Sequence, residues 1–192
     1  MIRMPEYSKT DITDLVDRKV AELLVAHASN YRDKCLLSLL WLIPVRPKEL
    51  MSLKRKDFKF FKDDDERPLS IEFTIVTKKL RKKKFFPKRE FEFKRGKIPE
   101  IMFKSIWRHV RSIGSERAIF DMTDRNMRFI VDRVSMRALG RNACPYLFRH
   151  SSLTRFAKEG AGVEQLMYLK GSADVGSVSP YLHGKKQDIE VK

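Results

Sequence analysis

The sequence predicts a mainly α-helical domain that carries one small antiparallel β-hairpin or sheet. Apolar residues recur at helical spacing over most of the 192-residue chain. Only within residues 69–94 do apolar and polar residues alternate in two short segments, which is typical of half-buried strands. The length suits a single domain, and we expect residues 1–192 to form it.

The first third of the chain predicts three helices. Thr10 and Asp11 are typical N-cap residues, and apolar side chains then recur at helical spacing as far as Leu24. The segment YRDKCLLSLLWLIPV becomes apolar on nearly all sides, which indicates a buried helix that Pro44 terminates. A short helix is expected at RPKELMSL, because proline is well tolerated in a first helical turn.

The middle of the chain predicts a loop followed by a hairpin. FFKDDDERPLS is polar and turn-rich, and its acidic run indicates a solvated turn rather than a metal site. LSIEFTIVT and REFEFK alternate as strands do, with Phe91 and Phe93 on one side of the second strand. The intervening segment, KKLRKKKFFPK, would form a long basic tip.

From Ile98 onward the pattern is helical again. Four helices are expected, at PEIMFKSIWRHVRSI, TDRNMRFIVDRVSMRAL, PYLFRHSSLTRFAKE and VEQLMYLK. A glycine follows each of them, as is common where a helix ends in a left-handed residue: Gly114, Gly140, Gly160 and Gly171. A last short stretch carries Tyr181.

The charge balance points to a polyanionic partner. Lys and Arg number 41 against 25 Asp and Glu, which gives a formal net charge of +16. Such an excess favours DNA, RNA or anionic lipid, and of these we favour nucleic acid. The densest basic run lies in the hairpin tip and is expected to contact a phosphate backbone, with a merely solvated loop as the alternative: Lys78, Lys79, Arg81, Lys82, Lys83 and Lys84.

Several other classes of protein do not fit the sequence. Cys35 and Cys144 are far apart and lie among apolar residues, so we expect free thiols in a reducing compartment. Neither they nor the four histidines have the spacing of a zinc site. No signal peptide or apolar run long enough to span a bilayer is visible, so a cytoplasmic protein is expected. Nucleotide-binding glycine loops and the G-x-S-x-G elbow are missing.

Several polar side chains are candidates for chemistry on a phosphate. Arg46 directly follows a buried helix, where its charge needs a partner or an anionic ligand. A structural ion pair with Glu49 is the alternative explanation. Tyr146 and Arg149 are spaced to share one helical face. Tyr181 follows a loop that contains Gly and Ser, where a hydroxyl can be exposed.

Together these segments resemble the catalytic domain of the tyrosine recombinase (phage integrase) family. PVRPKELMSLKRKDF resembles the Arg-x-x-Glu box, and FTIVTKK resembles the strand that carries a catalytic lysine, here Lys78. PYLFRHSSLTRFAKEGAGVEQLMYLKGSADVGSVSPYLH resembles the C-terminal box without a gap. The resemblance extends from about Thr10 to His183. Family members usually carry a separate N-terminal DNA-binding domain, so we expect residues 1–192 to be a catalytic fragment.

The resemblance implies cleavage and rejoining of double-stranded DNA through a 3′-phosphotyrosyl intermediate, without metal, ATP or another cofactor. Arg46 and Arg149 would hold the phosphate, and Tyr181 would attack it. Lys78, with Lys79 as second choice, would protonate the leaving 5′ oxygen. The family usually acts as a tetramer on DNA, so we expect a monomer or weak dimer without it. A type IB topoisomerase-like enzyme and a degenerate DNA-binding protein are the alternatives.

Two positions depart from the common family pattern. Tyr146 stands where His usually begins the His-x-x-Arg element, as in archaeal and archaeal-virus integrases, and Ser172 stands where His or Trp usually follows the glycine. Both would donate hydrogen bonds to the phosphate. A neutral phenol cannot accept the proton of the nucleophile, so weak base assistance and a rate that climbs toward alkaline pH are expected. Glu49 would orient a basic group, and His150 would be a packing residue.

Overall fold

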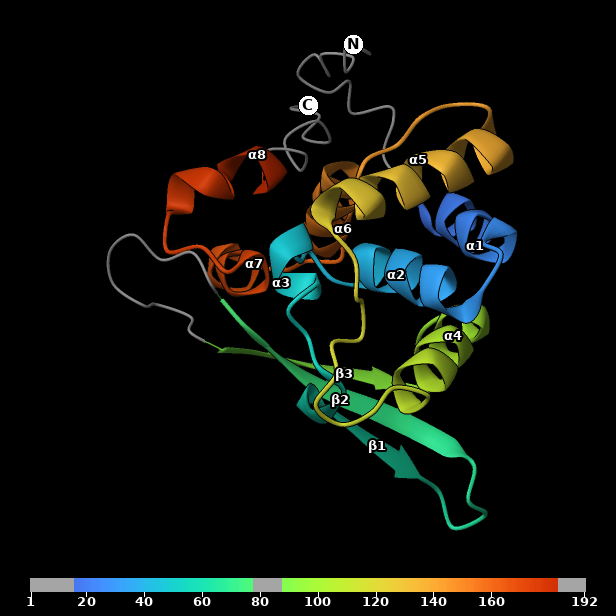
Figure 1. Cartoon of the computed structure of the whole chain (residues 1–192). Coiled ribbons are helices and arrows are strands. Elements are labelled where there is room, and N and C mark those ends of the chain that lie inside the picture. The colour runs from blue at the N-terminus through green and yellow to red at the C-terminus, as the bar shows by residue number, and fades with distance from the viewer. Residues whose placement is uncertain (1–15, 78–87, 183–192) are drawn as a thin grey trace.

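The computed structural model describes residues 16–77 and 88–182, and within them it is mostly helical with one small sheet. The sheet has three antiparallel strands in the order β1-β2-β3. Figure 1 shows the sheet lying along one side of the helices. The elements are α1 (Arg18–His27), α2 (Tyr31–Leu42), α3 (Pro47–Leu50), β1 (Phe58–Lys62), β2 (Pro68–Val76), β3 (Lys88–Lys94), α4 (Glu100–Arg111), α5 (Asp124–Leu139), α6 (Pro145–Lys158), α7 (Val163–Lys170) and α8 (Ser179–Leu182). The predicted fold class is confirmed.

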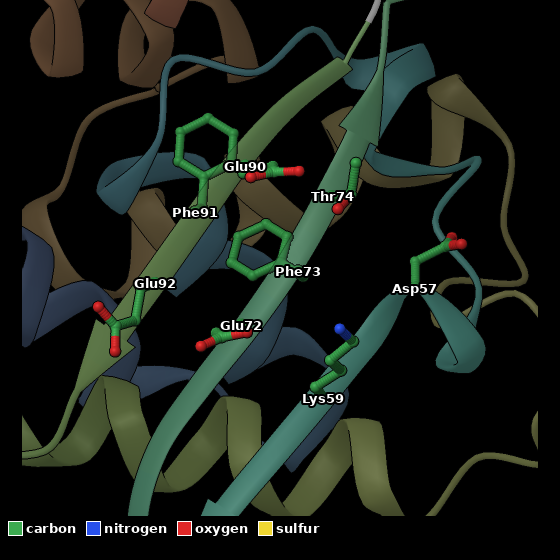
Figure 2. A pocket seen from close by; sticks show the side chains of 8 residues that line it. All are labelled: Asp57, Lys59, Glu72, Phe73, Thr74, Glu90, Phe91 and Glu92. Atoms are coloured by element: carbon green, nitrogen blue, oxygen red, sulfur yellow. The ribbon is translucent and has the colours of Figure 1, made fainter.

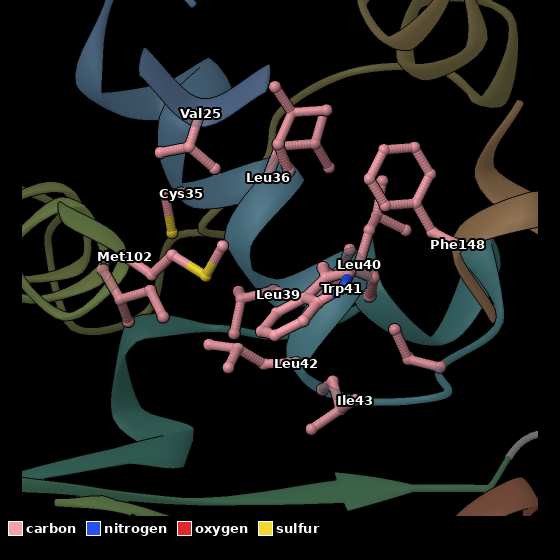
Figure 3. Packing of buried hydrophobic residues seen from close by; sticks show 14 of the residues in the cluster. Val25, Cys35, Leu36, Leu39, Leu40, Trp41, Leu42, Ile43, Met102 and Phe148 are labelled. Atoms are coloured by element: carbon pink, nitrogen blue, oxygen red, sulfur yellow. The ribbon is translucent and has the colours of Figure 1, made fainter. Parts of the chain in front are cut away.

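Helix α2 is the centre of the main hydrophobic core, as its apolar composition predicts. All of its residues from Cys35 to Leu42 are buried. Figure 3 shows Leu36, Leu39 and Trp41 projecting from the helix in different directions, with Phe148 of α6 packed nearby. Because α2 is enclosed on all sides, the residues just after it emerge at a fixed place between the other helices.

Among the described residues, helix α1 begins at Arg18, so Val16 and Asp17 lie outside it although the sequence pattern runs through them. Thr10 lies outside the described residues, and the helix begins after Asp17, which caps it. Val16 is buried and is held by two contacts distant in sequence: its N–H donates to Ser151 Oγ at 2.9 Å, and its carbonyl accepts from Trp41 Nε1 at 2.9 Å. Tertiary contacts therefore interrupt a helical pattern that is continuous in the sequence.

The prediction of a loop from Phe60 onward is wrong for its first three residues. Phe60, Phe61 and Lys62 belong to β1, which pairs with β2. The ring of Phe58 stacks on that of Phe73 with 4.8 Å between their centroids. This cross-strand packing stabilises β1 as a strand, although its sequence does not alternate between apolar and polar residues. The acidic turn follows directly after β1, as expected.

The last three helices form a smaller hydrophobic cluster of their own. Residues of α6 and α7 pack around Val178, and the ring of Tyr181 lies against this cluster. Helix α7 ends at Gly171, whose φ of 64° is left-handed as predicted. Figure 1 shows the ends of β2 and β3 reaching α7, and the backbone N–H of Glu90 donates to Tyr168 Oη at 2.7 Å. The hairpin is thus anchored to the C-terminal helices.

Within the described residues, no helix is both long and apolar enough to cross a membrane. Cys35 and Cys144 are free, as expected.

Candidate active site

Arg149 lies at the centre of a cluster of cationic side chains. It is only 6% exposed, on α6. Its Nη2 donates to the carbonyl of Lys170 at 2.7 Å, and its Nη1 donates to the carbonyl of Pro44. Both acceptors are neutral backbone groups just at or beyond the ends of α7 and α2. They orient the guanidinium group without neutralising its charge.

The surroundings of Arg149 favour an anionic ligand. Burial, and next the nearby charge of Arg46, lower the pKa of Arg149 to about 10. Both effects disfavour the charged form, which nevertheless persists at neutral pH. A guanidinium group has five N–H donors, so the two backbone contacts leave others for a ligand. A bound anion would favour the charged form of Arg149 and so oppose both the burial and the charge of Arg46.

Arg46 lies beside Arg149 and is held by Glu49. Arg46 Nη1 donates to Glu49 Oε1 at 2.9 Å, which is the ion pair that the sequence offered as an alternative. Its Nη1 and Nη2 each lie 3.4 Å from the carbonyl oxygen of Gly171. Since Arg149 contacts the preceding carbonyl, the two guanidinium groups meet at the C-terminal end of α7.

Arg89 belongs to this cluster, although the sequence did not single it out. It is fully buried on β3, and its Nη2 donates to Glu49 Oε2 at 2.8 Å. Its Nη1 donates to the carbonyl of Leu169 at 2.7 Å. Burial lowers the pKa of Arg89, and the Glu49 carboxylate opposes that shift. The alternation of β3 could have indicated that Arg89 is buried, because Arg89 falls on the same side of the strand as Phe91 and Phe93.

A single carboxylate therefore serves two arginines at this site. Glu49 is buried, and its second oxygen also accepts from the backbone N–H of Arg46 at 2.9 Å. The cations Arg46, Arg89 and Arg149 outnumber it, so the cluster keeps a positive charge. This is the electrostatic character that a phosphate site needs.

Gly171 allows α7 to end directly against Arg89. A Cβ atom at Gly171 would lie 3.1 Å from both Cζ and Nε of Arg89 and 3.2 Å from Oγ1 of Thr77. A larger residue here would push Arg89 or Thr77 aside and would also be strained by the positive φ, so glycine suits the position best. The next residue, Ser172, is thereby placed at the edge of the cluster, where its Oγ accepts from Ser177 Oγ at 3.0 Å.

Tyr181 reaches the same place from α8. Its hydroxyl lies 2.8 Å from Nδ1 of His150, and the two rings meet edge-on with 5.0 Å between centroids. Lys170 Nζ lies 5.3 Å from the centroid of the Tyr181 ring. Burial raises the pKa of Tyr181, and the charge of Arg149 opposes the shift. The nucleophile candidate is thus close to the arginine cluster within a single chain.

The contact of His150 with Tyr181 differs from the packing role expected for this histidine. No spacing rule in the sequence joins the two residues, because α8 returns to α6 only in the folded chain. Tyr146, in the first turn of α6, is 56% exposed and is the only predicted site residue, among those the structure describes, that is largely exposed.

The predicted basic tip is not described by the structure: Lys78, Lys79, Arg81, Lys82, Lys83 and Lys84 all lie outside the described residues. The strands on either side of it end at Val76 and Lys88. The Arg89 contact with Leu169 fixes one of those ends beside α7.

A hollow on the sheet has a lining of the opposite charge. Figure 2 shows its lining, in which Lys59 is outnumbered by carboxylates: Asp57, Glu72, Glu90 and Glu92. This negative lining would repel a phosphate. In residues 16–77 and 88–182, no group of three His, Cys, Asp or Glu residues could hold a metal ion.

The sequence matches tyrosine recombinases at low identity, although no protein-family model matches the chain. The tyrosine recombinase XerC of Bacillus pumilus is 24% identical over 204 residues, which cover 98% of this chain and 63% of that protein. XerC of Staphylococcus epidermidis is 25% identical over 161 residues, which cover 82% of this chain and 51% of that protein. The chain thus spans less than two thirds of the length of these curated relatives.

Solved structures show the same fold. The XerA recombinase superposes with a TM-score of 0.62 at 19% identity, over 95% of this chain and 62% of that one. The catalytic domain of bacteriophage HP1 integrase gives a TM-score of 0.57 at 15% identity, over 91% of this chain and 89% of that one. The fold is that of a tyrosine recombinase catalytic domain. The sequence matches and the fold matches thus point to the same group of proteins, the tyrosine recombinases and integrases.

Proposed function

We propose that this protein is a site-specific DNA recombinase or integrase, which cleaves and rejoins DNA strands through a 3′-phosphotyrosyl intermediate. One observation carries the proposal: Arg46, Arg149 and Tyr181 come from three distant segments and meet at the end of α7. The likeness to XerC, and to a XerH recombinase solved with its difH substrate, supports it (TM-score 0.64, 17% identity, 88% of this chain and 50% of that one).

The arginines suit a phosphodiester on its way to the transition state. Attack on phosphorus builds negative charge on the non-bridging oxygens, and preorganised guanidinium groups stabilise that charge. Arg149 is oriented by backbone carbonyls alone, so its charge is available to the phosphate. Arg46 is oriented by Glu49 and lies 3.4 Å from the neighbouring carbonyl oxygen, so both can grip one phosphate.

Tyr181 would attack the gripped phosphate and form the covalent link to the 3′ end. The 5′ oxygen that leaves needs a proton, and Lys78 is our candidate for its donor, with Lys79 second. Rejoining reverses these steps. The bond energy is kept in the phosphotyrosine, so neither ATP nor a metal ion is required.

The remaining predicted residues would assist in binding. Ser172 is at the edge of the arginine cluster and can donate its hydroxyl to the phosphate. Tyr146, exposed one turn before Arg149, can do so when DNA covers it. Glu49 would keep Arg46 in place. The basic run would contact the backbone of double-stranded DNA: Lys79, Arg81, Lys82, Lys83 and Lys84.

Tyr146 in place of His favours an archaeal or archaeal-virus origin. The protein would act in the cytoplasm, where it would assemble as a tetramer on DNA.

The proposal is tested by trapping the covalent intermediate. Supercoiled DNA that carries the sequences flanking the gene is incubated with the protein and stopped with SDS, and protein attached to 3′ ends is sought. We expect an adduct with the wild type and none with Tyr181→Phe. DNA binding without an adduct in the wild type would instead identify a protein that only binds DNA.

A further inference from the structure

His150 contacts the reacting atom of the proposed nucleophile. Its Nδ1 lies 2.8 Å from Tyr181 Oη, and that hydroxyl makes no other hydrogen bond within the described residues. The two residues are 31 positions apart, on α6 and α8, and the tyrosine ring is held by the small cluster around Val178. The contact therefore depends on how α8 packs and not on local chain geometry.

The groups around His150 keep its imidazole neutral. Burial, and next the charge of Lys170 on α7, lower the pKa of His150. Arg149 precedes it on α6, and Tyr181 faces it from α8. A neutral imidazole that accepts the phenolic proton at Nδ1 carries its own proton on Nε2. His150 is thus already in the protonation state that a proton acceptor requires.

Tyr181 needs such an acceptor. Its pKa is raised by burial above the ordinary value for tyrosine of about 10, so at neutral pH fewer than roughly one hydroxyl in a thousand is ionised. Tyr146, which stands in the usual place of a histidine, is a phenol and cannot fill this role.

We propose that His150 is the general base that accepts the proton of Tyr181 as the tyrosine attacks DNA. This inference rests on the proposed function. The O–H bond of Tyr181 breaks and its proton moves to Nδ1 of His150. The phenolic oxygen bonds to phosphorus, the bond from phosphorus to the 5′ oxygen breaks, and that oxygen takes a proton from the lysine general acid. On rejoining, the 5′ hydroxyl gives its proton back to the lysine and attacks phosphorus, the bond from phosphorus to the phenolic oxygen breaks, and the His150 imidazolium returns its proton to Tyr181.

The test separates proton acceptance from positioning. His150→Asn keeps an oxygen close to the Nδ1 position that can accept the tyrosine hydrogen bond, but it cannot take up the proton. The substrate is a duplex of the cleavage site mapped by the adduct assay, with sulfur in place of the leaving 5′ oxygen. A thiolate leaves without a proton, so the cleavage rate no longer depends on the general acid. Single-turnover rates are measured from pH 6 to pH 9.5, with His27→Asn on the exposed face of α1 as the control.

With His150 as the base, the alkaline rise expected from the sequence should be absent: the wild-type rate should level off near neutral pH, because burial and Lys170 lower the pKa of His150 and the neutral imidazole then predominates. At pH 7, cleavage by His150→Asn should be slower than wild-type cleavage by about 100-fold or more, within the usual range for general base catalysis. Its rate should rise about tenfold per pH unit as hydroxide replaces the base, and His27→Asn should match the wild type.

Three results would overturn the inference. His150→Asn could keep the wild-type rate or exceed it, or it could be slower by the same factor at every pH, as for a positioning residue. Independently of any variant, a wild-type rate that rises tenfold per pH unit up to pH 9.5 excludes an imidazole base. If the wild type forms no adduct at all, the proposed function is wrong and this inference is wrong with it. If the wild type is active and His150→Asn cleaves equally fast, only this inference is wrong.

Discussion

Replacing Glu49 by glutamine removes the one carboxylate that pairs with both Arg46 and Arg89 while keeping the shape of the side chain. The Glu49 side chain is 2% exposed, that of Arg89 is 0% exposed and that of Arg46 is 27% exposed. Breaking a buried ion pair by removing one partner costs about 3–5 kcal/mol. Arg46 can regain some water whereas Arg89 cannot, so we expect Glu49→Gln to lower the free energy of unfolding by about 3–4 kcal/mol.

Urea unfolding followed by the fluorescence of the buried Trp41 and Trp107 measures this change. The matched control is Glu22→Gln, which weakens an exposed pair with Arg18 at 2.8 Å and should cost about 0–1 kcal/mol. In the double variant Glu49→Gln/Arg89→Met, the buried charge that has lost its partner is also removed. The double variant should therefore be less destabilised than the sum of the single variants. If Glu49→Gln costs no more than the surface control, the buried pair does not hold the site together and the reasoning fails.

Three further predictions follow from the same contacts. Gly171→Ala should destabilise the protein more than Gly140→Ala, because both glycines have a positive φ but only at Gly171 would the new Cβ meet Arg89, at 3.1 Å; equal unfolding midpoints for the two variants would contradict this. Stability should fall as pH drops below about 6.5, because burial lowers the pKa of His109 so that the unfolded chain binds the proton first; His109→Gln should flatten the dependence of the urea midpoint on pH, and an unchanged slope would exclude His109 as a source. Arg149→Lys should retain DNA binding but slow covalent adduct formation by about 100-fold or more, because an ammonium group cannot make the same fork of contacts; a near wild-type rate would remove Arg149 from the site.

The periodic and capped parts of the fold could be predicted from sequence. Helix α2 is apolar all round, β2 alternates, and the glycines after α5 and α7 take left-handed conformations as expected. The start of α1 and the strand β1 could not be predicted, because each depends on contacts distant in sequence: the bonds of Val16 with Ser151 and Trp41, and the stacking of Phe58 on Phe73.

The sequence by itself determined which side chains are the candidates for chemistry, because Arg46, Arg149 and Tyr181 stand out by residue type, by spacing and by their resemblance to family motifs. Only the tertiary structure decided which groups surround them. Arg89 joins the candidate site because β3 turns it toward Glu49, and His150 joins it because α8 folds back over α6. The reason is physical: hydrogen bonds and ion pairs depend on distances of about 3 Å, and such distances between remote segments are set by packing of the core, which no local pattern records.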